Sequence, residues 1–207
     1  MSDQRYLTLL LIGAPGVGKG TQGSMLGRLA GFFHHSSGEV FRGLDPDSTK
    51  GREVASYTSK GELVPDDLTI RIWKSAIEKE VTSKRYDPAR DIVVLDGIPR
   101  NVPQAKFIEQ IANILHVVHL VCSDESEMVR RMQHRAREQN RSDDANEDVI
   151  RHRFEVYHRE TEPLLNHFAS ENITNVEAVA TPAEVLRDVL NCVIPIQNAQ
   201  FPATNRS

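Results

Sequence analysis

The 207-residue sequence predicts an α/β fold in which an open parallel sheet of about five strands is flanked by helices. Strand-like and helical stretches alternate along the chain, which is typical of parallel strands joined by covering helices. The first apolar run, at 6–12, leads into a glycine-rich loop that opens a helical stretch. The length suits one domain with a substantial core and room for small insertions.

The individual elements follow from apolar spacing and from start and stop signals. The predicted strands are 6–12, a short strand near 32–35, 92–95, 115–122 and 173–178. The predicted helices are 19–30, 37–43, 49–58, 67–82, 101–113, 124–138, 147–169 and 182–192. Asp66, after Pro65, is the predicted N-cap of the helix at 67–82. We expect one domain over 1–194, followed by a disordered tail at 195–207, because that segment is polar and lacks periodicity.

The glycine-rich loop reads GAPGVGKGTQ over residues 13–22 and fits the pattern G-x-x-x-x-G-K between a strand and a helix. Glycines allow backbone N–H groups to approach phosphates, and a helix N-terminus adds partial positive charge. Lys19 supplies a mobile full charge. The loop therefore predicts a polyphosphate site in a P-loop NTPase-type fold. Gly20 stands where a magnesium-binding Ser or Thr usually follows the lysine.

A second polar loop, Asp96-Gly97-Ile98-Pro99-Arg100, follows the strand at 92–95. Ligands bind at the carboxyl ends of strands in open α/β sheets, so this loop should lie beside the P-loop. An acidic residue in this place commonly holds magnesium, directly or through water. Asp96 is therefore the predicted metal residue.

Arginines are concentrated in the second half of the chain, including Arg131, Arg135, Arg141, Arg151 and Arg153. Planar guanidinium groups clamp phosphates bidentately, so the group predicts a focused anion site. Asp143 and Asp144 are expected to orient these arginines or to cap the helix that begins near Asn146, rather than to bind metal.

The composition argues against several classes of protein. The net charge of −4 and the lack of a dominant basic stretch disfavour nucleic-acid binding. No apolar run approaches the ~18 residues of a membrane span, and we expect no signal peptide. The two cysteines, Cys122 and Cys192, are far apart in the sequence, which favours a reducing, cytoplasmic setting.

The chain resembles the adenylate kinase family of nucleoside monophosphate kinases from its start to about Asn191. The motifs that carry the resemblance occur in order: GAPGVGKGTQ (13–22), SSGEVFR (36–42), GELVPDD (61–67), VLDGIPRNVPQA (94–105), RMQHR (131–135), RSDD (141–144) and RHRFEVYHRETEPL (151–164). The family loop reads GKGT, which accounts for Gly20. Its metal is held by phosphates and waters, with an Asp at the position of Asp96 reaching Mg²⁺ through water.

The resemblance implies the transfer of a phosphoryl group from MgATP to AMP, giving two ADP. It assigns the donor ATP to the P-loop, to Arg131 against the adenine, to Arg135 against the phosphates and to a backbone contact at Thr181. The P-loop residues in this set are Gly16, Val17, Gly18, Lys19, Gly20 and Thr21.

The acceptor AMP is assigned to a second set of residues by the same resemblance: Ser37, Arg42, Glu62, Leu63, Val64, Gly97, Arg100, Gln104, Arg141 and Arg153. The catalytic group implied by the family is Lys19, Arg100, Arg135, Arg141 and Arg153. The interval from Arg141 to Arg153 is one residue longer than the common form, so Arg151 is the alternative to Arg153.

The resemblance also implies an NMP-binding insertion at 36–64, a short LID at 134–144 and a monomer. Both insertions are expected to close over nucleotides and to exclude water. Some family members bind zinc through four LID cysteines. This chain has no cysteine between 134 and 144, so no zinc is expected.

Two alternatives remain at this point. A UMP/CMP kinase of the same superfamily is suggested by Arg100-Asn101, whereas the Ser37 hydroxyl and the Gln104 amide favour AMP, because an amide both donates and accepts toward an adenine edge. A non-catalytic nucleotide sensor is disfavoured because Lys19 and all four catalytic arginines are present.

Overall fold

The computed structural model describes residues 5–139, 144 and 146–202 of the chain. Five parallel strands form one sheet in the order β2-β3-β1-β4-β5. The strands are β1 (Tyr6–Ile12), β2 (Phe32–Ser36), β3 (Ile92–Asp96), β4 (Ala112–Val121) and β5 (Ile173–Glu177). The predicted parallel sheet of about five strands is confirmed.

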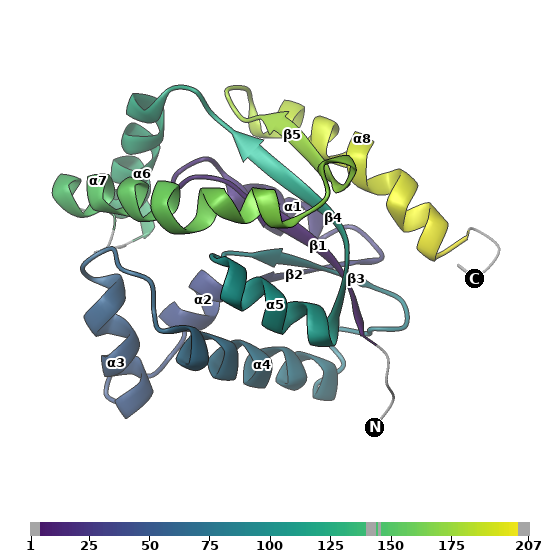
Figure 1. The fold of residues 1–207 in the computed structure, drawn as a ribbon, viewed down its shortest axis with the longest axis horizontal. Coiled ribbons are helices and arrows are strands. Elements are labelled where there is room, and N and C mark those ends of the chain that lie inside the picture. Colours follow the sequence, from purple (N-terminus) through teal and green to yellow (C-terminus); the bar gives the residue numbers. More distant parts are fainter. Residues whose placement is uncertain (1–4, 140–143, 145, 203–207) are drawn as a thin grey trace.

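The sheet is covered on both faces, as the period-two alternation of β1 requires. Leu9 and Leu11 pack into a core with α1 (Lys19–Leu26), α6 (Glu125–Gln139), α7 (Glu147–Val156) and α8 (Pro182–Gln200). Leu10 and Ile12 point into the opposite core, with α4 (Asp66–Thr82) and α5 (Val102–Ile111). In Figure 1, α4 and α5 lie below the sheet and α8 lies on its other side.

A smaller apolar cluster supports the segment between β2 and α4. Val54, Val64, Leu68 and Ile72 are its buried members, and they join α3 (Thr49–Thr58) to the first turns of α4. The short α2 (Ser37–Arg42) packs on the same cluster through Val40 and Phe41. This segment projects at the same end of the molecule as α6 and α7 (Figure 1).

The expected disordered tail at 195–207 is wrong for the part that the structure describes. Helix α8 continues through Pro195 to Gln200. Val185, Val189 and Val193 form one buried stripe, and the Gln197 side chain donates to the Ala30 carbonyl oxygen at 2.9 Å. Proline removes one helical hydrogen bond, but the buried stripe and this tertiary contact continue on both sides of it. Residues 203–207 lie outside the described residues.

The predicted helix 147–169 is also wrong in its second half. The α-helix α7 ends at Val156, followed by a π-helical segment, η2 (Tyr157–Thr161), and a 3₁₀ segment, η3 (Glu162–His167). Pro163 explains the change, because it has no N–H for the preceding turn and its ring clashes with the i−4 carbonyl.

No helix within the described ranges has the length and apolar character that a membrane crossing needs.

Candidate functional site

The P-loop is built at the carboxyl end of the central strand β1. Gly18 precedes α1 with φ 110° and offers no side-chain cap, so the first N–H groups of the helix stay open to a ligand. Gly16 has φ 81°, and a Cβ there would lie 2.7 Å from the Met128 carbonyl oxygen. The loop therefore requires glycine for both its conformation and its packing on α6.

Lys19 folds back over this loop. Its Nζ donates to the carbonyl oxygens of Gly13 at 2.6 Å and Ala14 at 2.9 Å. Burial lowers the pKa of Lys19 to about 8; the positive charges of Arg100, Arg153 and Arg135 also lower it, and Asp96 opposes them. The lysine thus stands among three arginines in a site of concentrated positive charge.

Asp96 ends β3 beside the P-loop and is 7% exposed. Burial raises its pKa, but His34, Lys19 and Arg100 outweigh burial and lower the pKa below the ordinary value. His34 Nε2 lies 3.6 Å from Asp96 Oδ2. A Cβ on Gly20 would also lie 3.6 Å from that oxygen, so the carboxylate faces the loop. An ionised carboxylate here suits Mg²⁺, which takes one or two protein carboxylates together with phosphates and water.

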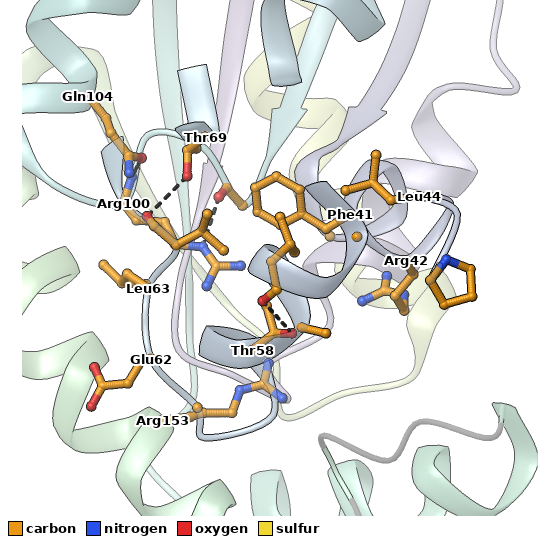
Figure 2. A pocket seen from close by; sticks show the side chains of 18 residues that line it. Phe41, Arg42, Leu44, Thr58, Glu62, Leu63, Thr69, Arg100, Gln104 and Arg153 are labelled. Atoms are coloured by element: carbon orange, nitrogen blue, oxygen red, sulfur yellow. Dashed lines mark hydrogen bonds between the residues drawn. The ribbon is translucent and has the colours of Figure 1, made fainter. Parts of the chain in front are cut away.

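An open cavity of about 250 Å³ lies between α2, α3 and the end of β3. Figure 2 shows Phe41, Arg42 and Leu44 on one side of it and Arg100 and Gln104 on the other. The predicted acceptor residues that line it are Arg42, Glu62, Leu63, Val64, Gly97, Arg100, Gln104 and Arg153. Eight of the ten predicted acceptor residues are therefore brought to one cavity.

Ser37 lies at the edge of this group without lining the cavity itself. It is 1% exposed, and no described residue forms a hydrogen bond with its hydroxyl. Gly97 stands against it with φ 79°, and a Cβ there would come within 2.6 Å of Ser37 Oγ. A buried hydroxyl without a partner is costly, so a ligand acceptor at this point would satisfy it.

A second open cavity, of about 330 Å³, lies on the α6 and α8 side of the P-loop. Its lining includes the predicted donor residues Gly16, Val17, Gly18, Gly20, Thr21, Arg131 and Arg135. Thr181 does not line it; its side chain and N–H form a capping box with Glu184 at the start of α8. Its neighbours Ala180 and Pro182 do line the cavity.

A third, smaller cavity of about 70 Å³ links the loop to the acceptor side. It is lined by Lys19 and Pro15 from the loop, and it shares Arg100 and Arg153 with the first cavity. The Arg100 Nε donates to the Gly97 carbonyl oxygen at 2.8 Å, which fixes the guanidinium against the loop after β3.

Asp144 holds two of the predicted arginines. Arg135 donates to Asp144 Oδ2 through Nε at 2.8 Å and Nη2 at 2.5 Å, and Arg153 Nη1 donates to Oδ1. The prediction that Asp144 orients arginines is confirmed, whereas the N-cap of α7 is Asn146. Arg151 is on the surface, where it pairs with Glu147. Arg141 and Asp143 lie outside the described residues.

Several residues of the site were not found from the sequence. Phe41 and Thr69 line the cavity between α2 and α3, and Ala178 and Val185 line the cavity beside α6 and α8. Phe41 lies inside the SSGEVFR motif, which was a usable signal. The others are ordinary core residues whose roles depend on tertiary packing. His34 comes within 3.6 Å of Asp96 because β2 pairs with β3, a contact between segments that are distant in the sequence.

Asp66 has a different role from the predicted one. The N-cap of α4 is Pro65, and Asp66 is the first helical residue. Its Oδ1 accepts from Gln104 Nε2 at 2.7 Å and Asn101 Nδ2 at 2.9 Å.

Among the described residues, no cluster of three or more His, Cys, Asp or Glu side chains could hold a metal ion.

Comparisons with known proteins agree with this geometry. A family model described as adenylate kinase matches residues 11–173. The chain is 38% identical over 170 residues to the adenylate kinase of Kocuria rhizophila, covering 80% of this chain and 86% of that protein. It is 35% identical over 193 residues to that of Thermobifida fusca (90% and 98%) and 36% identical over 184 residues to that of Thermus thermophilus (86% and 91%). The extent of the family match and of these identities shows that the chain belongs to the adenylate kinase family.

Proposed function

We propose that the protein is an ATP:AMP phosphotransferase that converts MgATP and AMP into two ADP. The observation that carries the proposal is the position of Lys19, Arg100 and Arg153 in one small cavity. This cavity shares both arginines with the cavity between α2 and α3, and the P-loop that supplies Lys19 also lines the cavity beside α6 and α8. A single nucleotide would need only one of the larger cavities. Two cavities beside one group of cations suit two nucleotides whose phosphates meet.

We assign the donor ATP to the cavity lined by the P-loop. The open N–H groups at the start of α1 would hold its phosphates, with Lys19 on the transferred group and Arg135 beside it. Arg131, which donates to Glu127 and to the Ala178 carbonyl oxygen, would stack on the adenine. The backbone near Thr181 would border the base.

We assign the acceptor AMP to the cavity between α2, α3 and β3. Arg42, Arg100 and Arg153 would hold its phosphate, and Arg141 would join them. The segment Glu62–Val64 and Gln104 would bound the base, with Ser37 Oγ as a further donor.

The chemistry needs no protein nucleophile. An oxygen of the AMP phosphate attacks the terminal phosphorus of ATP in line, and the bond from that phosphorus to the bridging oxygen breaks, leaving ADP. The protein contributes orientation and fixed positive charge where negative charge is shared between the two nucleotides. Closure of the insertions at 36–64 and 134–144 would exclude water, which could otherwise accept the phosphoryl group.

Asp96 would hold the Mg²⁺ that accompanies ATP, through water. When bound, the ion would neutralise charge on the phosphates. No zinc site is part of the proposal. A monomer and a cytoplasmic setting complete it, and the two free thiols, Cys122 and Cys192, are in keeping with a reducing compartment.

The test is an assay of the purified protein with MgATP and, in turn, AMP, UMP, CMP and GMP. We expect rapid ADP formation with AMP and much slower turnover with the others. Faster turnover with UMP or CMP would favour the pyrimidine alternative, and ATP binding without turnover on any acceptor would favour a sensor.

A further inference from the structure

The Gln104 side chain has both ends of its amide engaged by the protein. Its Oε1 accepts from the Arg100 backbone N–H at 2.8 Å, and its Nε2 donates to Asp66 Oδ1 at 2.7 Å. The side chain is 1% exposed and lies in the wall of the acceptor cavity (Figure 2). The amide is therefore fixed before any nucleotide binds.

The chemistry of the two partners permits only one orientation of this amide. A backbone N–H only donates, and a carboxylate only accepts. Turning the amide by 180° would place its NH₂ against the Arg100 N–H and its oxygen against the Asp66 carboxylate. Two hydrogen bonds, one of them to a charged group, would become two repulsive contacts.

A fixed amide still has bonding capacity toward the cavity. An amide NH₂ has two donors and its oxygen has two lone pairs, so one N–H and one lone pair remain. Adenine presents an amino donor at C6 and an acceptor at N1, which one orientation of the amide matches. Hypoxanthine presents the reverse, an oxygen at C6 and an N–H at N1, which requires the amide to be turned over.

We propose that Asp66 is a positioning residue for base selectivity, which holds the Gln104 amide in the orientation that accepts a 6-amino purine and rejects a 6-oxo purine. The inference rests on the proposed function, because it takes the cavity as the AMP site. Asp66 is not among the described residues that line that cavity, so it acts through Gln104. Asn101 also donates to Asp66, and its side-chain oxygen caps α5 by accepting from the Gln104 backbone N–H at 2.9 Å.

A matched control lies next to Asp66 in the same helical turn. Asp67 is also acidic and in the first turn of α4, but it is exposed and pairs with Arg71 at 3.0 Å. Removal of either carboxylate changes the charge at the helix N-terminus equally. Only Asp66 contacts Gln104.

The experiment measures kcat/KM for AMP and for inosine monophosphate, with MgATP as the donor, in the wild type and in Asp66→Ala, Asp66→Asn and Asp67→Ala. We expect Asp66→Ala to reduce the preference for AMP roughly tenfold, the scale of one hydrogen bond to a charged group. The KM for ATP should stay unchanged. Asp66→Asn, whose amide oxygen can still accept from Gln104, should keep most of the preference, and Asp67→Ala all of it.

An unchanged preference in Asp66→Ala would overturn the proposal, as would an equal fall in Asp67→Ala. If Asp66→Ala did not fold, an NMR measurement would decide between the outcomes. The signal is the side-chain amide resonance of Gln104, which is identified by its loss in Gln104→Leu. It should shift in Asp66→Asn and stay in place in Asp67→Asn; no shift in Asp66→Asn overturns the proposal. A wild type that does not phosphorylate AMP at all would instead refute the proposed function.

Discussion

Asp144 receives both the Nε and Nη2 of Arg135 on a single carboxylate oxygen, at 2.8 and 2.5 Å, and this aspartate is completely buried. Its other oxygen accepts from Arg153. One carboxylate thus links α6 to α7 and sets the direction of two guanidinium groups that line different cavities. Such preorganisation reduces the cost of orienting the arginines when phosphates bind.

Asp144→Ala should therefore weaken both stability and catalysis. The two arginines are partly exposed and can reach water, so we expect the free energy of unfolding to fall by about 1–3 kcal/mol rather than by the larger cost of an isolated buried charge. kcat/KM should fall for both ATP and AMP. Urea unfolding and steady-state kinetics measure the two effects, with the exposed Asp148→Ala as the control. Full activity would show that the arginines need no such support.

The predicted site residues whose positions follow from the sequence are those in short local patterns. The P-loop is read from Gly16, Gly18 and Lys19, because backbone conformation and charge are local requirements. Asp96 and Arg100 follow a buried strand, and parallel strands bring their carboxyl ends to one edge.

The parts that were missed depend on contacts between distant segments. Asp66 resembles a helix cap in sequence, yet its partners are Asn101 and Gln104 on another helix. Pro195 resembles the end of a helix, but burial of the Val185, Val189 and Val193 stripe carries α8 through it. Neither outcome is visible from propensity, because tertiary packing overrides it.

The two candidate bridging arginines are distinguished by their surroundings. Arg153 lines two cavities, whereas the Arg151 side chain is 69% exposed and paired with Glu147 at 2.7 Å. We expect Arg153→Ala to reduce kcat/KM for AMP by roughly 10²–10³, the scale for one electrostatic donor. Arg151→Ala should change it less than about twofold, because exposed ion pairs contribute little. The reverse ranking would restore Arg151 as the bridging residue.

Lys19→Met should remove most of the activity while leaving the fold intact. The lysine bonds only carbonyl oxygens of its own loop among the described residues, so the scaffold does not depend on it. We expect kcat to fall by roughly 10²–10³ or more, since one charge on the transferred phosphoryl group is lost. Lys106→Met, on the exposed face of α5, is the control. A near-normal kcat with an unchanged melting temperature would assign the lysine another role.

The lowered pKa of Lys19 predicts proton uptake when ATP binds. With a pKa of about 8, half of the side chains are neutral at pH 8 in the free protein. Phosphate charges favour the protonated form and raise the pKa, so binding should take up to about half a proton at pH 8 and almost none at pH 6. Calorimetry with a non-hydrolysable ATP analogue, in buffers of different ionisation enthalpy, measures this number. Lys19→Met should abolish the uptake; a buffer-independent enthalpy in the wild type at pH 8 would contradict the assignment.

His35 predicts a loss of stability in mild acid. It is 4% exposed, with its ring edge-on to Trp73, and burial together with His34 lowers its pKa to about 4. Below pH 6.5 the unfolded chain binds a proton that the folded chain does not, so the free energy of unfolding falls as the pH drops and levels off below about pH 4. This shift corresponds to about 3 kcal/mol between pH 7 and pH 4.

Urea unfolding of the wild type and of His35→Leu across this pH range measures the effect. The difference between their free energies of unfolding should change with pH by that amount. If the free energy of unfolding of His35→Leu changed with pH as it does in the wild type, the pKa of His35 would be the same in the folded and the unfolded chain. A partner for its ring nitrogen would then offset its burial.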